Sequence, residues 1–255
     1  MSTAVPPLLA RHRALKVIGL GGVGGIVARY AAVWLAGLDE ELPLVLVDGD
    51  AFEPRNARRM LFRRCGNKAA VLAEELSEHL GDALSIVAVE EYVGPDNVER
   101  LVRGGDLVLL AVDNHATRKL VGDRCAALDD ACLISGGNDG VGPDASGRVL
   151  RGTYGNVQIH WREGGRDRTP PLDRMHPEIA RPADRRPDEA SCGELLAAVP
   201  QILFTNLAAA SAMLNALRAY LDGELRYAEA CFDVLDALMR PVLPLPEARS
   251  DGPAG

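Results

Sequence analysis

The chain has 255 residues, of which 47% are hydrophobic and 25% are charged, and its formal net charge at pH 7 is −8. A chain of this length and hydrophobic content can bury a full core as a single domain. The acidic balance argues against a broad nucleic-acid-binding surface, because such domains are usually basic, and it leaves room only for a local basic patch.

The five cysteines are widely spaced, and no two of them form a C-x-x-C pair. A four-thiolate zinc site therefore has no support, and the spacing favours reduced thiols in a cytoplasmic protein. The N-terminus lacks the basic and apolar regions of a secretory signal. The apolar run at 26–37 is interrupted by Arg29 and is too short to cross a bilayer. We therefore expect a soluble cytoplasmic protein with no membrane segment.

Short apolar runs alternate with helical patterns over residues 16–135. The runs are typical of buried parallel strands, whereas the apolar residues of 68–80 recur on one helical face. The predicted strands are 16–20, 42–47, 84–89, 106–112 and 131–135. The predicted helices are 24–38, 68–80, 95–103 and 117–128. This alternation predicts a Rossmann-like, doubly wound α/β fold with a mostly parallel sheet and helices on both of its faces.

The composition changes after residue 136. We expect antiparallel C-terminal strands at 153–161 and 227–233, and a long helix at 195–221 that tolerates Pro200 near its start. Residues 162–193 are rich in Pro, Arg, Asp and Gly, which predicts a long crossover loop.

The domain organisation follows from these elements. We predict one domain over residues 1–242, with the loop at 162–193 as an insertion. The residues from Pro241 onwards have the composition of disordered segments, so we expect 243–255 to be a disordered tail.

A glycine-rich turn follows the first predicted strand, in the stretch VIGLGGVGG at 17–25. Its G-x-G-x-x-G pattern and one further glycine are Gly19, Gly21, Gly24 and Gly22. Glycines let backbone N–H groups approach a phosphate at a helix N-terminus, where the helix dipole favours an anion. Asp48 ends the next strand, where a carboxylate can accept hydrogen bonds from ribose hydroxyls. The combination predicts an adenine-nucleotide site; the alternative is a tight turn that binds nothing.

A polar cluster follows this acid directly, in the stretch DGDAFEPRNARRMLF. Its polar members are Asp48, Asp50, Glu53, Asn56, Arg58 and Arg59. Lys68 begins the next helix, and Asp113 and Asn114 follow a later strand. Because parallel strands end at one edge of the sheet, we expect these groups to share a pocket.

The chemistry of this cluster suits transfer of a nucleotidyl group. Arg59 and Lys68 can neutralise triphosphate oxygens, and Asp113 can hold Mg²⁺. Asn56 can orient a phosphate or an attacking carboxylate. Attack of a carboxylate on the α-phosphate would give an acyl-adenylate and pyrophosphate, whereas nicotinamide chemistry would need none of these residues.

Four motifs together resemble the ubiquitin-activating-enzyme-like family of the ThiF, MoeB and HesA type. They are GLGGVGG, VDGDAFEPRNARR, the helix-leading Lys68 and AVDNHATR. The resemblance covers roughly residues 14–140. It implies ATP- and Mg²⁺-dependent adenylation of a carboxylate, typically the C-terminal glycine of a small ubiquitin-like or sulfur-carrier protein. It also suggests a homodimer.

The resemblance implies roles for individual residues. Asn56, Arg59 and Lys68 resemble the family's ATP-phosphate and catalytic residues, and Asp113 resembles its magnesium-binding catalytic acid. Met60 departs from the pattern, because the family usually has glutamine there. The expected nucleotide-binding residues are Gly19, Gly21, Gly22, Gly24, Asp48, Asp50, Arg58 and Asn114.

Cys192 is a candidate thiol nucleophile. It lies in DEASCGEL, just before the predicted long helix, whose N-terminus would lower the pKa of the thiol. Thiol-forming relatives carry a reactive cysteine on a comparable crossover segment. The alternative is a structural thiol.

Three other functions remain as alternatives. A relative of this family could activate a tRNA-nucleoside or small-molecule carboxylate, and the arginines of 162–186 could favour RNA locally. A pseudoenzyme would use the same fold for binding only. An NAD-dependent oxidoreductase is a more distant alternative.

Overall fold

The computed structural model describes residues 5–243 except 39, 58, 144–146 and 190–200. Within these residues one sheet contains nine strands, in the order β13-β12-β10-β7-β6-β1-β2-β5, with β11 paired to β10. The parallel strands are β1 (Ala14–Ile18), β2 (Leu44–Val47), β5 (Ile86–Val89), β6 (Asp106–Leu110) and β7 (Ala131–Asn138). The antiparallel strands are β10 (Tyr154–Glu163), β11 (Arg166–Asp167), β12 (Glu229–Asp233) and β13 (Leu238–Val242).

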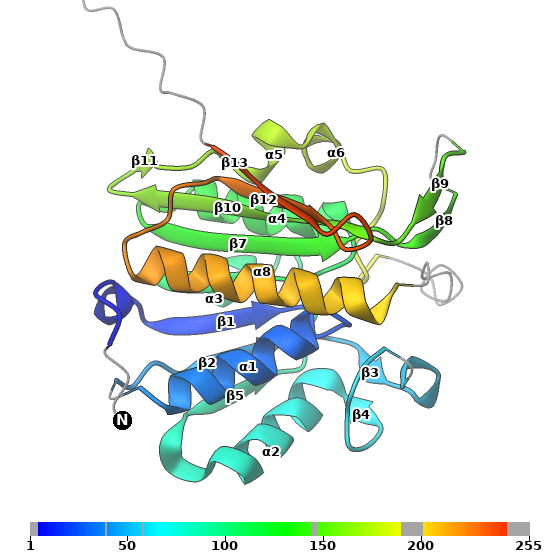
Figure 1. The fold of residues 1–255 in the computed structure, drawn as a ribbon. Coiled ribbons are helices and arrows are strands. Elements are labelled where there is room, and N and C mark those ends of the chain that lie inside the picture. The colour runs from blue at the N-terminus through cyan, green and yellow to red at the C-terminus, as the bar shows by residue number, and fades with distance from the viewer. Residues whose placement is uncertain (1–4, 39, 58, 144–146, 190–200, 244–255) are drawn as a thin grey trace, which may run out of the picture.

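Helices cover both faces of this sheet (Figure 1). The first face carries α1 (Gly24–Ala36), α2 (Lys68–Leu80) and α8 (Leu203–Leu221). The opposite face carries α3 (Val98–Leu101), α4 (His115–Ala126), α5 (Leu172–Met175) and α6 (Pro177–Ala180). Short 3-10 helices lie at Leu9–Arg11, Pro54–Asn56 and Gly81–Ala83. No helix among the described residues is long and apolar enough to cross a membrane.

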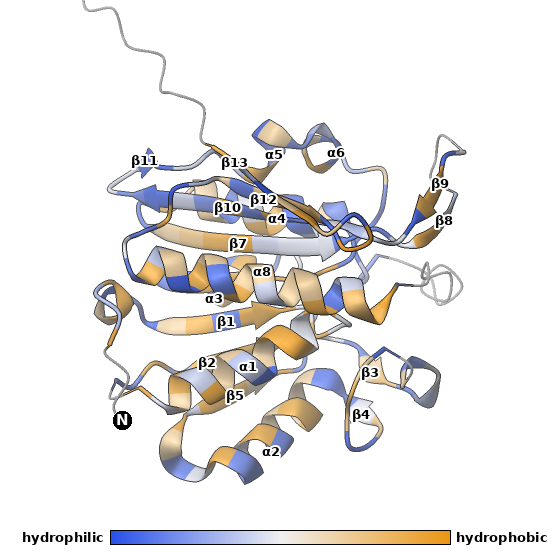
Figure 2. Ribbon diagram, in the orientation of Figure 1, coloured by the Kyte–Doolittle hydropathy of each residue, from blue (hydrophilic) through white to orange (hydrophobic). Residues whose placement is uncertain are grey.

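Each face of the sheet has its own hydrophobic core. On β1, Leu15 and Val17 face the core beneath α1, α2 and α8, whereas Ile18 belongs to the core on the α4 face. On β6, Leu107 and Leu109 alternate in the same way with Val108 and Leu110. A strand buried on both faces is mostly apolar, and β1 is drawn mostly in the hydrophobic colour in Figure 2, with the paired Lys16 as its one charged residue. This confirms the predicted doubly wound α/β fold.

The sheet reverses its direction of winding at β1. The strand pairs in parallel with β2 on one side and with β6 on the other. Open α/β sheets bind ligands beyond the carboxyl ends of the strands at such a point. The fold therefore brings the segments after β1, β2 and β6 to one place.

Three parts of the C-terminal prediction were wrong. Residues 162–193 are not a continuous loop, because β10 extends to Glu163 and the short elements β11, α5 and α6 follow. Each of these elements is too short for a periodic pattern, and single buried residues such as Leu172 and Ile179 hold them to the core. The strand predicted at 227–233 is present as β12, but it is not the last strand of the sheet.

The strand β13 adds to the edge of the sheet at 238–242, where the sequence predicted the beginning of a tail at Pro241. Its residues are mostly exposed, so no hydrophobic alternation indicates a strand. An edge strand also tolerates proline. The predicted helix start at 195 lies outside the described residues, but Gln201 and Ile202 are not helical and α8 begins at Leu203. Of the predicted tail at 243–255, only Leu243 is described, and the single domain stays a prediction.

Two small hairpins were not predicted. One pairs β3 (Ala51–Phe52) with β4 (Gly66–Asn67), and the other pairs β8 (Val141–Pro143) with β9 (Val149–Arg151). The first hairpin closes the segment that carries the polar cluster and brings its end back to the start of α2.

A buried ion pair gives a testable prediction for the sheet. Lys16 Nζ lies 2.6 Å from Asp106 Oδ2, and the two side chains are 10% and 4% exposed. Asp106→Leu would leave the buried Lys16 ammonium without its counter-charge, with only the Leu101 carbonyl to accept a hydrogen bond at 2.7 Å, so we expect the unfolding free energy to fall by about 3–5 kcal/mol. Urea unfolding measures this loss. The double variant K16M/D106L should recover most of it, and a loss below about 1 kcal/mol in D106L would show that the pair is exposed to water.

Candidate active site

A large pocket opens at the carboxyl ends of β1, β2 and β6. Its volume is about 1570 Å³. Most of the residues predicted for the site line it: Gly19, Gly21, Gly22, Asp48, Asp50, Asn56, Arg59, Lys68, Asp113 and Asn114. Arg58 and Cys192 lie outside the described residues. Asp48 and Asp113 are more than 60 residues apart in the sequence. The order of the strands in the sheet brings them to the same pocket.

The glycine turn between β1 and α1 forms the floor of the pocket. Gly19 has φ +83°, a conformation that favours glycine. Gly24 does not line the pocket; a Cβ there would lie 1.8 Å from the carbonyl oxygen of Gly19, so its role is close packing of α1 against the turn. Met60 lines the pocket beside the turn, since its Cε lies 3.8 Å from the position of a Cβ on Gly21.

Asp48 is held at one side of the glycine turn. Its Oδ2 accepts a hydrogen bond from Leu20 N at 2.6 Å, and its Oδ1 accepts one from Asp50 N at 2.8 Å. Asp48 is 8% exposed. Burial raises the pKa of its carboxyl, while the Lys68 charge and the two backbone donors oppose the rise. The carboxylate is thus fixed in orientation with its free lone pairs available to a ligand.

The buried Lys68 ammonium forms an ion pair with the partly exposed Asp50 next to Asp48. Lys68 Nζ donates to Asp50 Oδ2 at 2.7 Å and lies 3.8 Å from Asp48 Oδ2. Burial alone would raise the pKa of Asp50, but the Lys68 charge and hydrogen bonds from Lys68 and Tyr92 lower it. Asn67 caps α2 and donates to the Asp48 carbonyl at 2.9 Å, which fixes the position of Lys68. This side of the pocket therefore holds a charged network that is assembled before any ligand binds.

Arg59 and Asn56 lie on the irregular segment between β3 and β4. The guanidinium nitrogen Nη2 of Arg59 is 3.4 Å from Asn56 Oδ1, a long hydrogen bond. Asn56 ends a short 3-10 helix, and its carbonyl accepts a hydrogen bond from the Arg59 backbone N–H at 3.0 Å. Both side chains line the same pocket as the glycine turn.

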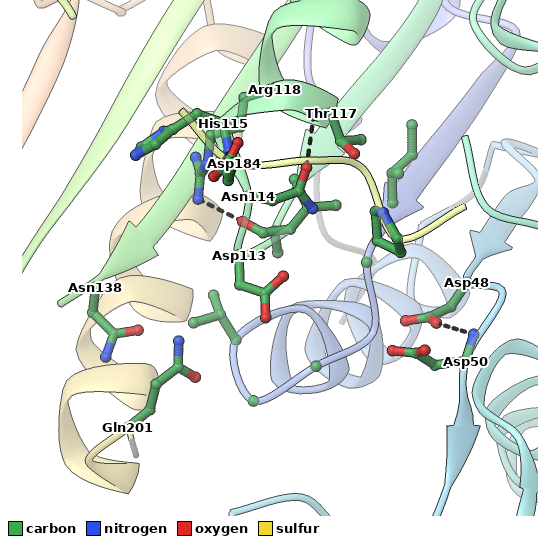
Figure 3. Close-up of a pocket in the computed structure, with 18 of the residues that line it drawn as sticks. Asp48, Asp50, Asp113, Asn114, His115, Thr117, Arg118, Asn138, Asp184 and Gln201 are labelled. Carbon is green, nitrogen blue, oxygen red and sulfur yellow. Dashed lines mark hydrogen bonds between the residues drawn. The ribbon is translucent and has the colours of Figure 1, made fainter. Parts of the chain in front are cut away.

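Asp113 follows β6 and is exposed to the pocket. Figure 3 shows its carboxylate pointing toward the glycine turn. The neighbouring Asn114 is the N-cap of α4, and its Oδ1 accepts the Thr117 N–H at 2.8 Å. Arg118 donates to the carbonyl of Val112 at 2.7 Å, so it fixes the backbone that carries Asp113. Burial lowers the pKa of Arg118 to about 10, which leaves it charged at neutral pH.

The N-terminus of α4 is occupied by a carboxylate from a distant segment. Asp184 accepts hydrogen bonds from the backbone N–H groups of His115 and Ala116 at 2.7 and 2.9 Å. Figure 3 shows Asp184 next to Asn114 at the start of this helix. Residues 183–185 thereby close the pocket on the α4 side.

His176 lines the pocket and lies between two glutamates. Its Nδ1 lies 2.7 Å from Glu178 Oε1, and its Nε2 lies 3.0 Å from Glu229 Oε1. Burial alone would lower the pKa of His176, but the hydrogen bonds and charges of the two glutamates raise it above its ordinary value. Asn156 also donates to Glu229 Oε1, at 2.8 Å.

A family model describing the ThiF family matches residues 9–231 of this chain. The chain belongs to the ThiF family. Among curated proteins, HesA of Leptolyngbya boryana is 35% identical over 112 residues, which are 43% of this chain and 39% of HesA. The SAMP-activating enzyme E1 of Haloferax volcanii is 35% identical over 43% of this chain and 40% of its own length. The adenylyltransferase and sulfurtransferase MOCS3 of Drosophila sechellia is 33% identical over 51% of this chain and 28% of its own length.

These matches cover well under half of each relative's own length. Solved structures extend the similarity of the fold. E. coli MccB, in a crystal structure with ATP, superimposes with a TM-score of 0.66 at 13% identity, over 94% of this chain and 67% of MccB. The crystal structure of PaaA superimposes with a TM-score of 0.64 at 16% identity, over 91% of this chain and 73% of PaaA.

Several residues of this ThiF-family pocket were not predicted. Arg118 ends the quoted motif AVDNHATR, so its position carried a signal, but its hydrogen bonds to the backbone did not follow from spacing. Asp184 contacts a helix 69 residues away from it in the chain, and no local pattern marks such a contact. Glu229 does not line the pocket but contacts His176, and the strand prediction at 227–233 did not indicate this contact.

The contacts of His176 predict a loss of stability on the alkaline side. Its ring can donate to both glutamates only when protonated. Because the pKa is raised above 6.5 in the folded state, this stabilisation is complete below 6.5 and is lost as the pH rises through the folded-state value. The pKa values of Glu178 and Glu229 are lowered. The stabilisation that these two carboxylates contribute is therefore lost only as the pH falls below their ordinary value of 4.5.

The melting temperature measured against pH tests this. The wild-type curve should fall between neutral and alkaline pH, whereas His176→Gln, which cannot titrate, should lack that part of the decline. Parallel curves for the two proteins would contradict the assignment.

Proposed function

We propose that this chain is an ATP-dependent adenylyltransferase that activates a carboxylate, forming an acyl-adenylate and pyrophosphate. One observation carries the proposal: the glycine turn, Asp48, Lys68, Arg59 and Asp113 line one pocket at the switch point of the sheet. The curated names of the relatives support it, since they include adenylyltransferases and an E1 activating enzyme.

The residues would divide the work along the nucleotide. Asp48 accepts hydrogen bonds from the ribose, and the backbone N–H groups at Gly21 and Gly22 bind phosphate oxygens at the N-terminus of α1. Arg59 and Lys68 stabilise the negative charge of the phosphates. An acceptor carboxylate oxygen then attacks the α-phosphorus, its bond to phosphorus forms, and pyrophosphate leaves with the electron pair of the broken bond.

Asp113 fits a magnesium ion. It presents an exposed carboxylate to the pocket, and Mg²⁺ is usually bound by one or two carboxylates together with phosphate oxygens and water. The ion would neutralise charge on the phosphates. We assign Asn56 to orienting a phosphate or the acceptor, because its amide lies beside Arg59 in the same wall.

We infer that the acceptor is the C-terminal glycine of a small ubiquitin-like or sulfur-carrier protein. The name of the H. volcanii relative, a SAMP-activating enzyme, supports a protein acceptor. The family resemblance also supports a homodimer, and the free cysteines among the described residues support a reducing, cytoplasmic location.

Exchange of labelled pyrophosphate into ATP tests the function. We expect exchange that depends on a small protein ending in glycine and disappears when that glycine is deleted. Free amino acids and small carboxylates provide the second arm, and RNA carrying a carboxylated nucleoside the third. A chain that binds ATP·Mg²⁺ but supports exchange with none of these acceptors would contradict the proposal.

Variants of the pocket give a sharper prediction. Asp113→Asn and Arg59→Ala should each lower the rate of exchange by about a hundredfold or more, because each removes charge stabilisation from the reacting phosphates. Arg64→Ala is the matched control, since Arg64 is exposed and pairs with Glu74 outside the pocket. Equal rates in D113N and R64A would contradict the assigned role of Asp113.

Cys192 remains a proposed thiol nucleophile for a second step. Its thiolate would attack the acyl carbon of the adenylate, and AMP would leave, giving a thioester. Intact-mass spectrometry after incubation with ATP and acceptor should then detect a covalent adduct that is absent in Cys192→Ser. Turnover without an adduct in the wild type would exclude this step.

A further inference from the structure

Asn206, in the first turn of α8, has a buried carboxamide without hydrogen-bond partners in the described part of the chain. The residue is completely buried, and neither its Nδ2 nor its Oδ1 has a hydrogen-bond partner among the described residues. The adjacent Thr205 is equally buried, but its hydroxyl donates to the Gly152 carbonyl at 2.7 Å. Unpaired buried polar groups destabilise a fold and are rare in native structures, so a carboxamide with neither atom paired calls for an explanation.

Asn206 lies directly against the glycine turn. A Cβ on Gly22 would lie 2.2 Å from Asn206 Nδ2 and 3.4 Å from Gln201 Oε1. A donor nitrogen and an acceptor oxygen thus converge on the same point beside Gly22. Gln201 lines the pocket, and Figure 3 shows its carboxamide directed into the space below Asp113 and Asn138.

The carboxamide of Gln201 lies on the side of the glycine turn away from Asp48. Figure 3 shows Gln201 and Asn138 across the turn from Asp48 and Asp50. With the ribose on the Asp48 side, the Gln201 side faces the phosphates and the approaching acceptor. A neutral donor there would add a hydrogen bond to a phosphate oxygen without adding a charge.

We propose that Gln201 binds a phosphate oxygen of the nucleotide and that Asn206 is the positioning residue that orients it. This inference rests on the proposed ATP site. In the complex, Asn206 Nδ2 donates to Gln201 Oε1, and Gln201 Nε2 donates to the phosphate. Because a carboxamide carries its acceptor and donors on opposite branches, fixing the oxygen of Gln201 also fixes the direction of its NH₂ group.

The test uses Asn206→Leu, which keeps the side-chain volume and removes the unpaired amide. Without nucleotide, N206L should melt at or above the wild-type temperature, because an orphaned polar group has been removed. Its dissociation constant for ATP·Mg²⁺, measured by calorimetry, should rise about tenfold, as expected when a hydrogen bond to a charged group is lost. Adenosine, which lacks phosphates, should bind both proteins equally.

Two further variants separate orientation from a general structural effect. Gln201→Leu should weaken ATP binding as much as N206L does, and the double variant should show no further loss, because both changes abolish the same oriented hydrogen bond from Gln201 to the phosphate. Thr205→Val is the matched control: it removes a satisfied buried hydroxyl, so it should lower the melting temperature and leave ATP affinity unchanged.

Four results would overturn the inference. They are an unchanged ATP affinity in N206L, a lower melting temperature of N206L without nucleotide, multiplied losses in the double variant, and an equal loss of ATP affinity in T205V. If the wild type does not bind ATP·Mg²⁺, the proposed function fails and this inference fails with it. If the wild type binds ATP and N206L binds it equally well, only the role of Asn206 is lost.

Discussion

The close contact between Gly19 and Gly24 is the constraint on which the site depends. A side chain on Gly24 would collide with the Gly19 carbonyl, so only glycine lets α1 begin directly above the end of β1. That approach directs the N-terminus of α1, with its unpaired N–H groups, toward the space beyond the strands. The same space receives Asp48 from β2 and Asp113 from β6, because these strands flank β1 on either side.

The two sides of the glycine turn differ in their electrostatics. On the Asp48 side, Lys68, Asp50 and Asp48 form a charged network that the cap of α2 holds in place. Such a network is preorganised, so the binding of a nucleotide requires little rearrangement there. On the Gln201 side, the carboxamides of Gln201 and Asn206 carry no charge, and that of Asn206 is buried without a hydrogen-bond partner among the described residues. The stability of the fold and the readiness of the site are therefore opposed at this position.

The sequence was sufficient to predict the parallel half of the sheet, because buried strands and glycine turns leave strong local patterns. It also predicted the residues that line the pocket from β1, β2 and β6, since the ends of parallel strands share an edge. It was insufficient for β13, whose exposed residues form a strand only because β12 offers an edge. Asp184 and Asn206 escaped prediction for a related reason: their importance comes from contacts with the α4 N-terminus and with Gly22, and no spacing in the chain encodes either contact.

The central claim is spatial, and a crystal structure with a non-hydrolysable ATP analogue and Mg²⁺ tests it most directly. The account predicts that the ribose lies on Asp48, the triphosphate lies over Gly21 and Gly22, and Arg59 and Asp113 contact the phosphates or their metal ion. A nucleotide bound elsewhere, or one whose phosphates lie away from the glycine turn, would contradict it.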